Sequence, residues 1–143
     1  MKLRELMTQN VRTCRQDSQL TDVARIMAEV NCGCVPVVEG ERVVGVITDR
    51  DIVLRAVAEG RDIRTTPVKE CMTTPVITAA PDMDAHRAAE LMAAKQIRRL
   101  CVVDGERLVG IVALGDMATE RIHVDEAGKA LSDISVPSRP GAH

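Results

Sequence analysis

The sequence predicts an α+β fold of the α/β type, made of two β-α-β-β-α repeats that pack about a pseudo-two-fold axis. Residues 7–52 align with residues 72–117 without a gap, which indicates a duplication. Each copy has an apolar pattern of helical period, followed by two β-branched runs around a glycine-containing turn. A unit of roughly 50 to 60 residues buries too little surface to be stable alone. We therefore expect the copies to pack together and to leave a ligand-sized groove between them.

Identical residues recur at matching places in the two copies. Met7-Thr8 is repeated as Met72-Thr73, and Gly40-Glu41-Arg42 as Gly105-Glu106-Arg107. The predicted boundaries are 1–62 for the first repeat (motif core 7–57), 63–70 for a polar connector, 71–124 for the second repeat, and 125–143 for a C-terminal helix and tail.

The elements of the first repeat follow in order along the chain. Residues 11–13 predict a short extended segment, and residues 35–38 and 43–47 predict the two strands of a hairpin. Between them the spacing predicts an amphipathic helix, capped by Asp17 or Ser18, whose apolar face carries Leu20, Val23, Ala24, Met27 and Val30. A second helix begins near Thr48 or Asp49 and ends at Gly60.

The second repeat predicts the same order. Residues 76–78 form the extended segment, 85–95 a helix with smaller apolar residues, and 100–103 with 108–112 a hairpin. Its second helix begins near Gly115, residues 125–135 predict a last helix, and residues 136–141 read as a frayed tail.

Composition excludes several classes of function. The 19 basic residues against 21 acidic ones, and the absence of Phe, Tyr and Trp, disfavour a dedicated nucleic-acid binder. No run approaches the roughly 20 apolar residues that span a bilayer, and no signal peptide is visible, so we expect a cytoplasmic protein that does not bind membranes. The five cysteines are an odd number, and we expect them to be reduced.

These residues resemble a tandem pair of cystathionine-β-synthase (CBS) domains, the arrangement called a Bateman module, in a stand-alone protein. The resemblance covers residues 3–121. It is carried by the Met-Thr pair at the head of each copy, the Val35-Pro36-Val37-Val38 strand, Gly45 to Ile52, and Gly110 to Asp116.

The resemblance implies a regulatory module that binds an adenine nucleotide (AMP, ADP or ATP) or an adenosyl compound between the copies and signals to a separate protein effector. In the family pattern Gly-x-x-Thr/Ser-x-x-Asp, the hydroxyl lies near ribose and phosphate, and the carboxylate holds the ribose hydroxyls. Thr48 and Asp51 match it, whereas the second copy has Ala113 before Asp116, which implies one competent site and one weakened site. A carboxylate can accept both hydroxyls of a diol. The further candidate ligand contacts are Arg50 and Arg99 for the phosphate, and Val11, Thr13, Val35 and Val37 for the rest of the nucleotide.

Alternatives remain open. Thr48 and Asp51 also have the spacing of a capping box, which needs no ligand. Cys32-Gly33-Cys34 lacks a second ligand pair, so we expect no metal site and no required cofactor. No motif of a known enzyme class is present, and we expect no catalytic activity. We expect the helices to form a homodimer, and a ligand-free dimerisation or interaction scaffold is the alternative function.

Overall fold

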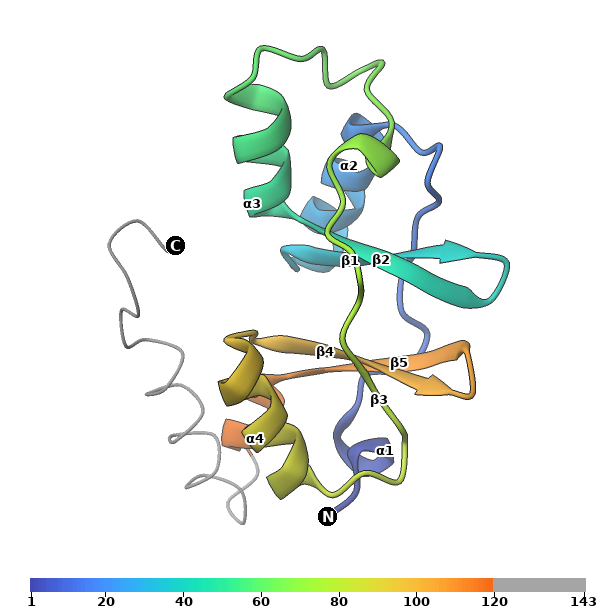
Figure 1. Ribbon diagram of the computed structural model, residues 1–143, viewed down its shortest axis with the longest axis vertical. Helices are drawn as coiled ribbons and strands as arrows, with labels where there is room; N and C mark the ends of the chain where they lie inside the picture. Colours follow the sequence, from blue (N-terminus) through green and yellow to red (C-terminus); the bar gives the residue numbers. More distant parts are fainter. Residues whose placement is uncertain (120–143) are drawn as a thin grey trace. The chain divides into compact units, whose positions relative to one another are not determined.

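The computed structural model describes residues 1–119, so the expected helix at 125–135 and the tail beyond it lie outside the described residues. This part of the chain contains both helices and strands, which confirms the predicted α+β class. The chain divides into two compact units (Figure 1). Unit 1 contains Met1–Asn10, Thr78–Gly105 and the described residues from Val109 onward, and unit 2 contains Val11–Ile77 with Glu106–Leu108.

Unit 2 is built on the predicted hairpin. Strand β1 (Cys34–Glu39) pairs antiparallel with β2 (Arg42–Thr48) in a register that runs from Cys34 opposite Thr48 to Glu39 opposite Arg42. Gly40 occupies the turn at φ 64°, a left-handed conformation that favours glycine. Helices α2 and α3 lie on the same side of this hairpin in Figure 1.

Helix α2 (Leu20–Val30) confirms the predicted helix but not the whole of its predicted face. Leu20 and Val23 are buried, and Ile26 and Met27 pack against the same core. The placement of Ala24 and Val30 on the buried face is wrong, because both side chains are exposed. Ala24 lies at the edge of the apolar stripe, and Val30 is the last residue of the helix.

The predicted cap of α2 is also wrong. Gln19 is the N-cap and makes no side-chain capping bond, while the Ser18 hydroxyl accepts from the backbone N–H of Arg15, 2.9 Å away. The first amides of the helix instead donate to backbone carbonyls of the connector: Leu20 to Thr66 at 3.3 Å and Thr21 to Ile63 at 3.2 Å. Carbonyls from a distant segment thus satisfy the free N–H groups that every helix start presents.

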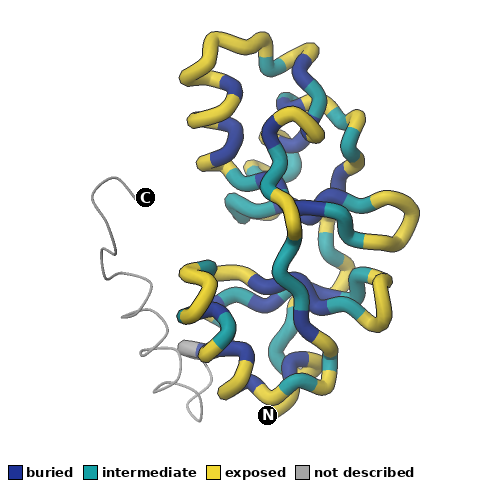
Figure 2. The backbone as a smooth tube through the Cα atoms, in the orientation of Figure 1, coloured by how far each residue is buried: buried dark blue, intermediate teal, exposed yellow. Residues whose placement is uncertain are grey.

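Unit 1 contains the equivalent elements of the second copy. Strands β3 (Thr78–Ala79), β4 (Arg99–Asp104) and β5 (Arg107–Ala113) are neighbours in the order β5-β4-β3, and α4 (Ala85–Lys95) precedes the β4–β5 hairpin. The side chain of Asp84 caps α4 by accepting from His86 N, and the helix buries Ala85, Ala88, Ala89 and Met92. In both hairpins the turns are exposed and buried residues lie along the strands (Figure 2).

The head of each repeat packs on the elements of the other repeat. Helix α1 (Leu3–Leu6) lies in unit 1, where Leu3 N donates to Met83 O and Thr8 pairs with Ile111 of β5. The 3-10 helix η2 (Val68–Glu70) lies in unit 2, where the same bonds recur: Val68 N donates to Ser18 O, and Thr73 pairs with Val46 of β2. Each compact unit therefore contains segments from both halves of the sequence. The predicted boundaries, the pseudo-two-fold axis and the groove stay predictions.

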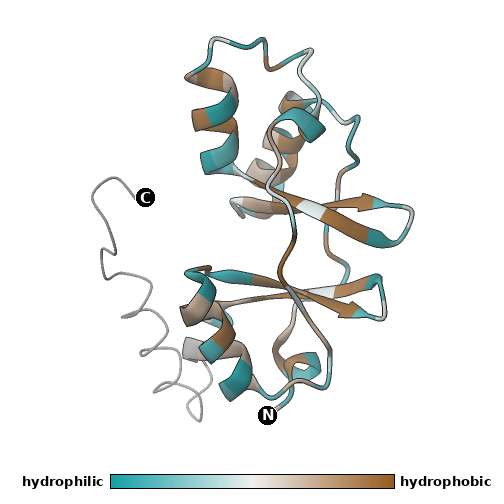
Figure 3. Ribbon diagram, in the orientation of Figure 1, coloured by the Kyte–Doolittle hydropathy of each residue, from teal (hydrophilic) through white to brown (hydrophobic). Residues whose placement is uncertain are grey.

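The second helix of the first repeat begins as predicted and then changes its geometry. Helix α3 (Asp49–Ile52) continues into the π-helix η1 (Val53–Val57), and Gly60 follows at φ 71°. Asp51, Ile52 and Ala56 are buried, whereas Val53, Leu54 and Val57 are exposed. This helical segment accordingly carries both hydrophobic and hydrophilic stretches in Figure 3.

Candidate functional site

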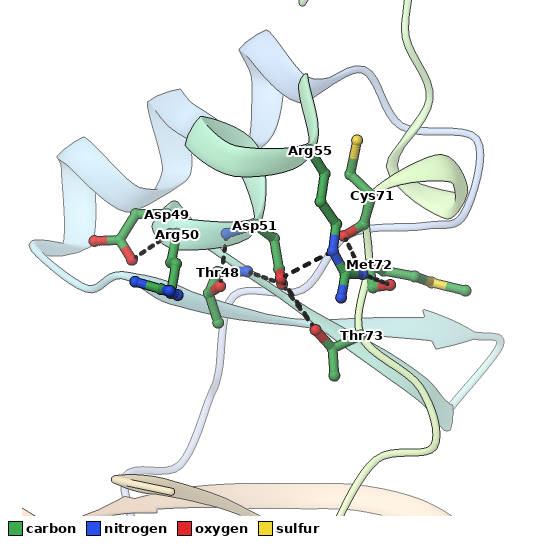
Figure 4. A network of polar contacts seen from close by, with 8 residues as sticks. All are labelled: Thr48, Asp49, Arg50, Asp51, Arg55, Cys71, Met72 and Thr73. Carbon is green, nitrogen blue, oxygen red and sulfur yellow. Dashed lines mark hydrogen bonds and ion pairs between the residues drawn. The ribbon is translucent and has the colours of Figure 1, made fainter. Parts of the chain in front are cut away.

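Thr48 and Asp51 meet at the junction where β2 ends and α3 begins. The Thr48 hydroxyl accepts from Asp51 N at 3.0 Å, and the Asp51 carboxylate accepts from Thr48 N at 3.0 Å (Figure 4). These two bonds form a reciprocal capping box, which confirms the structural alternative. The cap fixes the Asp51 carboxylate at the helix start.

Asp51 is a buried acid with a third partner that comes from a distant segment. Its exposed fraction is 8%. The hydroxyl of Thr73 lies 3.1 Å from each carboxylate oxygen and donates to them. Buried polar groups need such partners, because an unpaired carboxylate would lose its hydration without replacement. Thr73 therefore compensates for the burial of Asp51.

Arg55 brings positive charge to the same place. Its Nε lies 3.9 Å from Oδ1 of Asp51, one helical turn along the chain. Its Nη1 donates to two carbonyl oxygens of the head segment, Cys71 O at 3.2 Å and Met72 O at 3.0 Å. The side chain remains about half exposed, at 52%. Arg55 thus reaches the carboxylate and the head segment while part of its guanidinium stays in solvent.

The side chain of Arg50, the basic candidate predicted in the first copy, points away from Asp51. Arg50 is exposed, and in Figure 4 its side chain lies with Asp49 on the far side of Thr48 from Asp51. The Asp49 carboxylate accepts from Arg50 N at 2.8 Å and lies against Gly33, where an added Cβ atom would come within 2.6 Å of Oδ2. Asp49 is therefore held by local contacts rather than directed toward Asp51.

The four remaining candidates of the first copy divide by burial. Val35 and Val37 lie in the core cluster of unit 2 with exposed fractions of 1% and 0%. Val11 and Thr13 are partly exposed, just before the bridge between Cys14 and Val37. Only Val11 and Thr13 of this group present surface to a ligand without repacking of the core.

The second copy has half of the capping box. Ala113 N donates to the Asp116 carboxylate at 2.8 Å, which matches the bond from Thr48 N to Asp51. Ala113 has no hydroxyl to return a bond to the helix start. Asp116 is partly exposed, and Arg99 is exposed at the start of β4. Both candidates belong to unit 1, whereas Thr48 and Asp51 belong to unit 2.

Sequence reasoning missed Thr73 and Arg55 as members of the site. Arg55 follows Asp51 by four residues, a spacing that places oppositely charged side chains on one helix face and could have indicated the pair. Thr73 lies 22 residues from Asp51, and its place in the repeated Met-Thr head was the only available signal. The predicted site therefore lacked the Thr73 hydroxyl and the Arg55 guanidinium group, which both contact the Asp51 carboxylate.

The five cysteines form no disulfide within residues 1–119, and burial changes the pKa of two of them. Burial raises the pKa of Cys14 to about 12, with a smaller contribution from nearby Cys34. Burial likewise raises the pKa of Cys71. Within residues 1–119, no three His, Cys, Asp or Glu side chains gather as metal ligands would. Over the same residues, every helix falls short of the length and apolar character of a membrane span.

Comparisons with known proteins agree with the duplication. The family model described as CBS domain matches residues 3–57 and 68–123. The chain is 44% identical over 133 residues to the CBS domain-containing protein YhcV of Bacillus subtilis (strain 168), an alignment that covers 93% of this chain and 94% of that protein.

Two solved structures are similar over most of the chain. One is the CBS domain protein PAE2072 from Pyrobaculum aerophilum complexed with AMP, at a TM-score of 0.79 and 28% identity, covering 90% of this chain and 99% of that chain. The other is the hexameric CBS-CP12 protein from bloom-forming cyanobacteria, at a TM-score of 0.76 and 31% identity, covering 87% of this chain and 73% of that chain.

Proposed function

We propose that this chain, which belongs to the CBS domain family, is a cytoplasmic regulatory protein that binds an adenine nucleotide at Asp51 and performs no catalysis. The observation that carries the proposal is the buried Asp51 carboxylate, fixed by Thr48 and accompanied by Arg55. The AMP complex of the similar Pyrobaculum protein supports the choice of ligand.

The chemistry of Asp51 suits a ribose. An ionised carboxylate accepts two hydrogen bonds, and the vicinal hydroxyls of a ribose donate two at matching spacing. Arg55 lies 3.9 Å from the Asp51 carboxylate, so its guanidinium group is close enough to meet a phosphate, whereas Arg50 points away from Asp51. With no aromatic residue in the chain, the base contacts aliphatic side chains, for which Val11 and the methyl group of Thr13 have exposed surface.

The second copy supports at most a weaker site. Asp116 retains the carboxylate, but Ala113 lacks the hydroxyl that Thr48 supplies, and Glu120 stands where the first copy has Arg55. We therefore place AMP, ADP or ATP at Asp51 and assign Arg99 and Asp116 to the weaker site.

Self-association belongs to the same proposal. Val53, Leu54 and Val57 are 53%, 45% and 58% exposed on one helical segment, and large apolar side chains gathered on a surface are typical of protein interfaces. A homodimer through this segment would cover them, and the hexameric cyanobacterial relative supports oligomer formation. The effector that receives the signal is then a separate protein. The alternative, a ligand-free scaffold, is favoured by the same exposed residues.

A thermal-shift titration with an external dye tests the proposal, because the chain has no Trp or Tyr to report unfolding. AMP, ADP and ATP are added to the unchanged chain and to Asp51→Ala. Ligand at about 100 times its dissociation constant stabilises a protein by roughly 2.7 kcal/mol, and the melting temperature rises accordingly. We expect a rise in the unchanged chain and none in Asp51→Ala. No rise with any of the three nucleotides favours the scaffold.

A further inference from the structure

We propose that Thr73 is an internal competitor for Asp51, so that a nucleotide binds by displacing its hydroxyl and thereby loosens the hold of unit 2 on the head segment 71–73. This inference rests on the proposed function. It goes beyond that function by explaining how ligand binding would change the chain, because the carboxylate that receives the ligand also holds a segment of the second repeat.

Three kinds of contact hold the head segment, and two of them involve the ligand site. Thr73 donates its hydroxyl to both Asp51 oxygens at 3.1 Å. Arg55 donates to the carbonyls of Cys71 and Met72 while it lies beside the same carboxylate. The third kind is independent of the site: Thr73 makes two backbone bonds to Val46, at 2.7 and 3.1 Å, and Cys71 is buried in the core of unit 2.

Competition follows from the number of donors and from burial. Thr73 has one hydroxyl hydrogen and shares it between two oxygens, whereas a ribose offers two separate hydroxyl hydrogens. Asp51 is only 8% exposed and the Thr73 hydroxyl lies 3.1 Å from both of its carboxylate oxygens, which leaves little room for a ligand beside this hydroxyl. A ribose that takes both oxygens therefore leaves the Thr73 hydroxyl without its acceptor.

A phosphate group on the ligand would also weaken the contacts between Arg55 and the head segment. Its guanidinium is half exposed and bonded to neutral carbonyls, and a phosphate is a stronger acceptor than a carbonyl. Rotation of Arg55 toward phosphate would remove both bonds to the head segment. Residues 74–77 then connect this segment directly to β3 of unit 1, which gives the change a covalent route between the units.

The test combines affinity with hydrogen exchange and uses AMP as the probe. Thr73→Val keeps the shape of the side chain and removes the competing hydroxyl, so AMP should bind roughly tenfold more tightly than to the unchanged chain. Thr73→Ser retains a hydroxyl and Thr74→Val makes the same change at an exposed neighbour, so both should bind AMP as the unchanged chain does. In the unchanged chain, AMP should increase amide exchange at residues 71–73.

The outcomes separate this inference from the proposed function. Tighter binding to Thr73→Val together with faster exchange at 71–73 supports displacement. Equal or weaker binding to Thr73→Val, or AMP-induced protection of residues 71–73 in the unchanged chain, overturns displacement while nucleotide binding stands. Absence of AMP binding to both the unchanged chain and Thr73→Val overturns the proposed function and this inference together.

Discussion

The carbonyl oxygen of Thr73 lies 3.0 Å from the position that a Cβ atom on Gly45 would occupy. The head segment crosses β2 at this glycine, and Met72 and Thr74 also approach it closely. Gly110 has the same relationship to Met7 and Thr8 in the other unit. Each glycine therefore lets the head of one repeat lie against the hairpin of the other.

Gly45→Ala should destabilise the protein by roughly 1–3 kcal/mol, the usual cost of inserting a methyl group into a well-packed contact. The limiting contact is a backbone oxygen, which cannot rotate away as a side chain would. Urea unfolding followed by circular dichroism measures the change. Gly115→Ala, in helix α5 (Leu114–Thr119), is the matched control: outside its own helix, no atom of the described residues lies within 4 Å of the added Cβ, so it should stabilise by up to about 1 kcal/mol.

Thr48→Ala should lower the free energy of unfolding by about 1 kcal/mol, because the helix start loses the hydroxyl that accepts from Asp51 N. The reverse change at the equivalent place, Ala113→Thr, should raise it by up to the same amount. Asp116 already accepts from the backbone of residue 113, so the new hydroxyl completes a capping box. Both variants are compared with the unchanged chain by urea unfolding; equal stability of all three contradicts the role of the cap.

Alkaline pH should destabilise the folded chain through Cys14. Burial raises the pKa of its thiol from 9.0 to about 12, so between these values the unfolded chain loses the proton and the folded chain keeps it. The free energy of unfolding therefore falls as the pH rises from about 9 toward 12, and this contribution is constant below that window.

Unfolding curves at a series of pH values from 7 to 11 check this dependence. The alkaline decline should be shallower in Cys14→Ala, which has no thiol to titrate. Parallel declines in the two proteins would assign the effect to other groups.

Leu54→Glu should weaken self-association, because it places a charge among the exposed side chains of Val53 and Val57. Sedimentation or light scattering measures the molecular mass in solution. Ala94→Glu, at an exposed position of α4, is the control and should leave the mass unchanged. Retention of the same oligomer by Leu54→Glu would place the interface elsewhere.

Local features of the fold could be predicted from the sequence because neighbouring residues determine them. The hairpin turns at Gly40 and Gly105, and the reciprocal bonds of Thr48 and Asp51, involve residues only a few positions apart. The cap of α2 could not be predicted, since carbonyls of Ile63 and Thr66 supply it through the fold.

The candidate site likewise combines local features that the sequence predicts with long-range contacts that it does not. Its carboxylate follows from a local motif, but Thr73 reaches Asp51 across 22 residues, and the crossing of head segments between repeats leaves no periodic pattern in the sequence. Val35 and Val37 have the apolar character expected of a base contact and equally of a core. Only the fold shows that both side chains are buried.

Isothermal titration calorimetry of AMP tests the central claim, nucleotide binding at Asp51, most directly. The unchanged chain should bind AMP, Asp116→Ala should retain most of that affinity, and Asp51→Ala should lose at least tenfold, since two bonds to a charged acceptor disappear. Undiminished affinity in Asp51→Ala, or loss only in Asp116→Ala, would contradict the assignment of the ligand to this carboxylate.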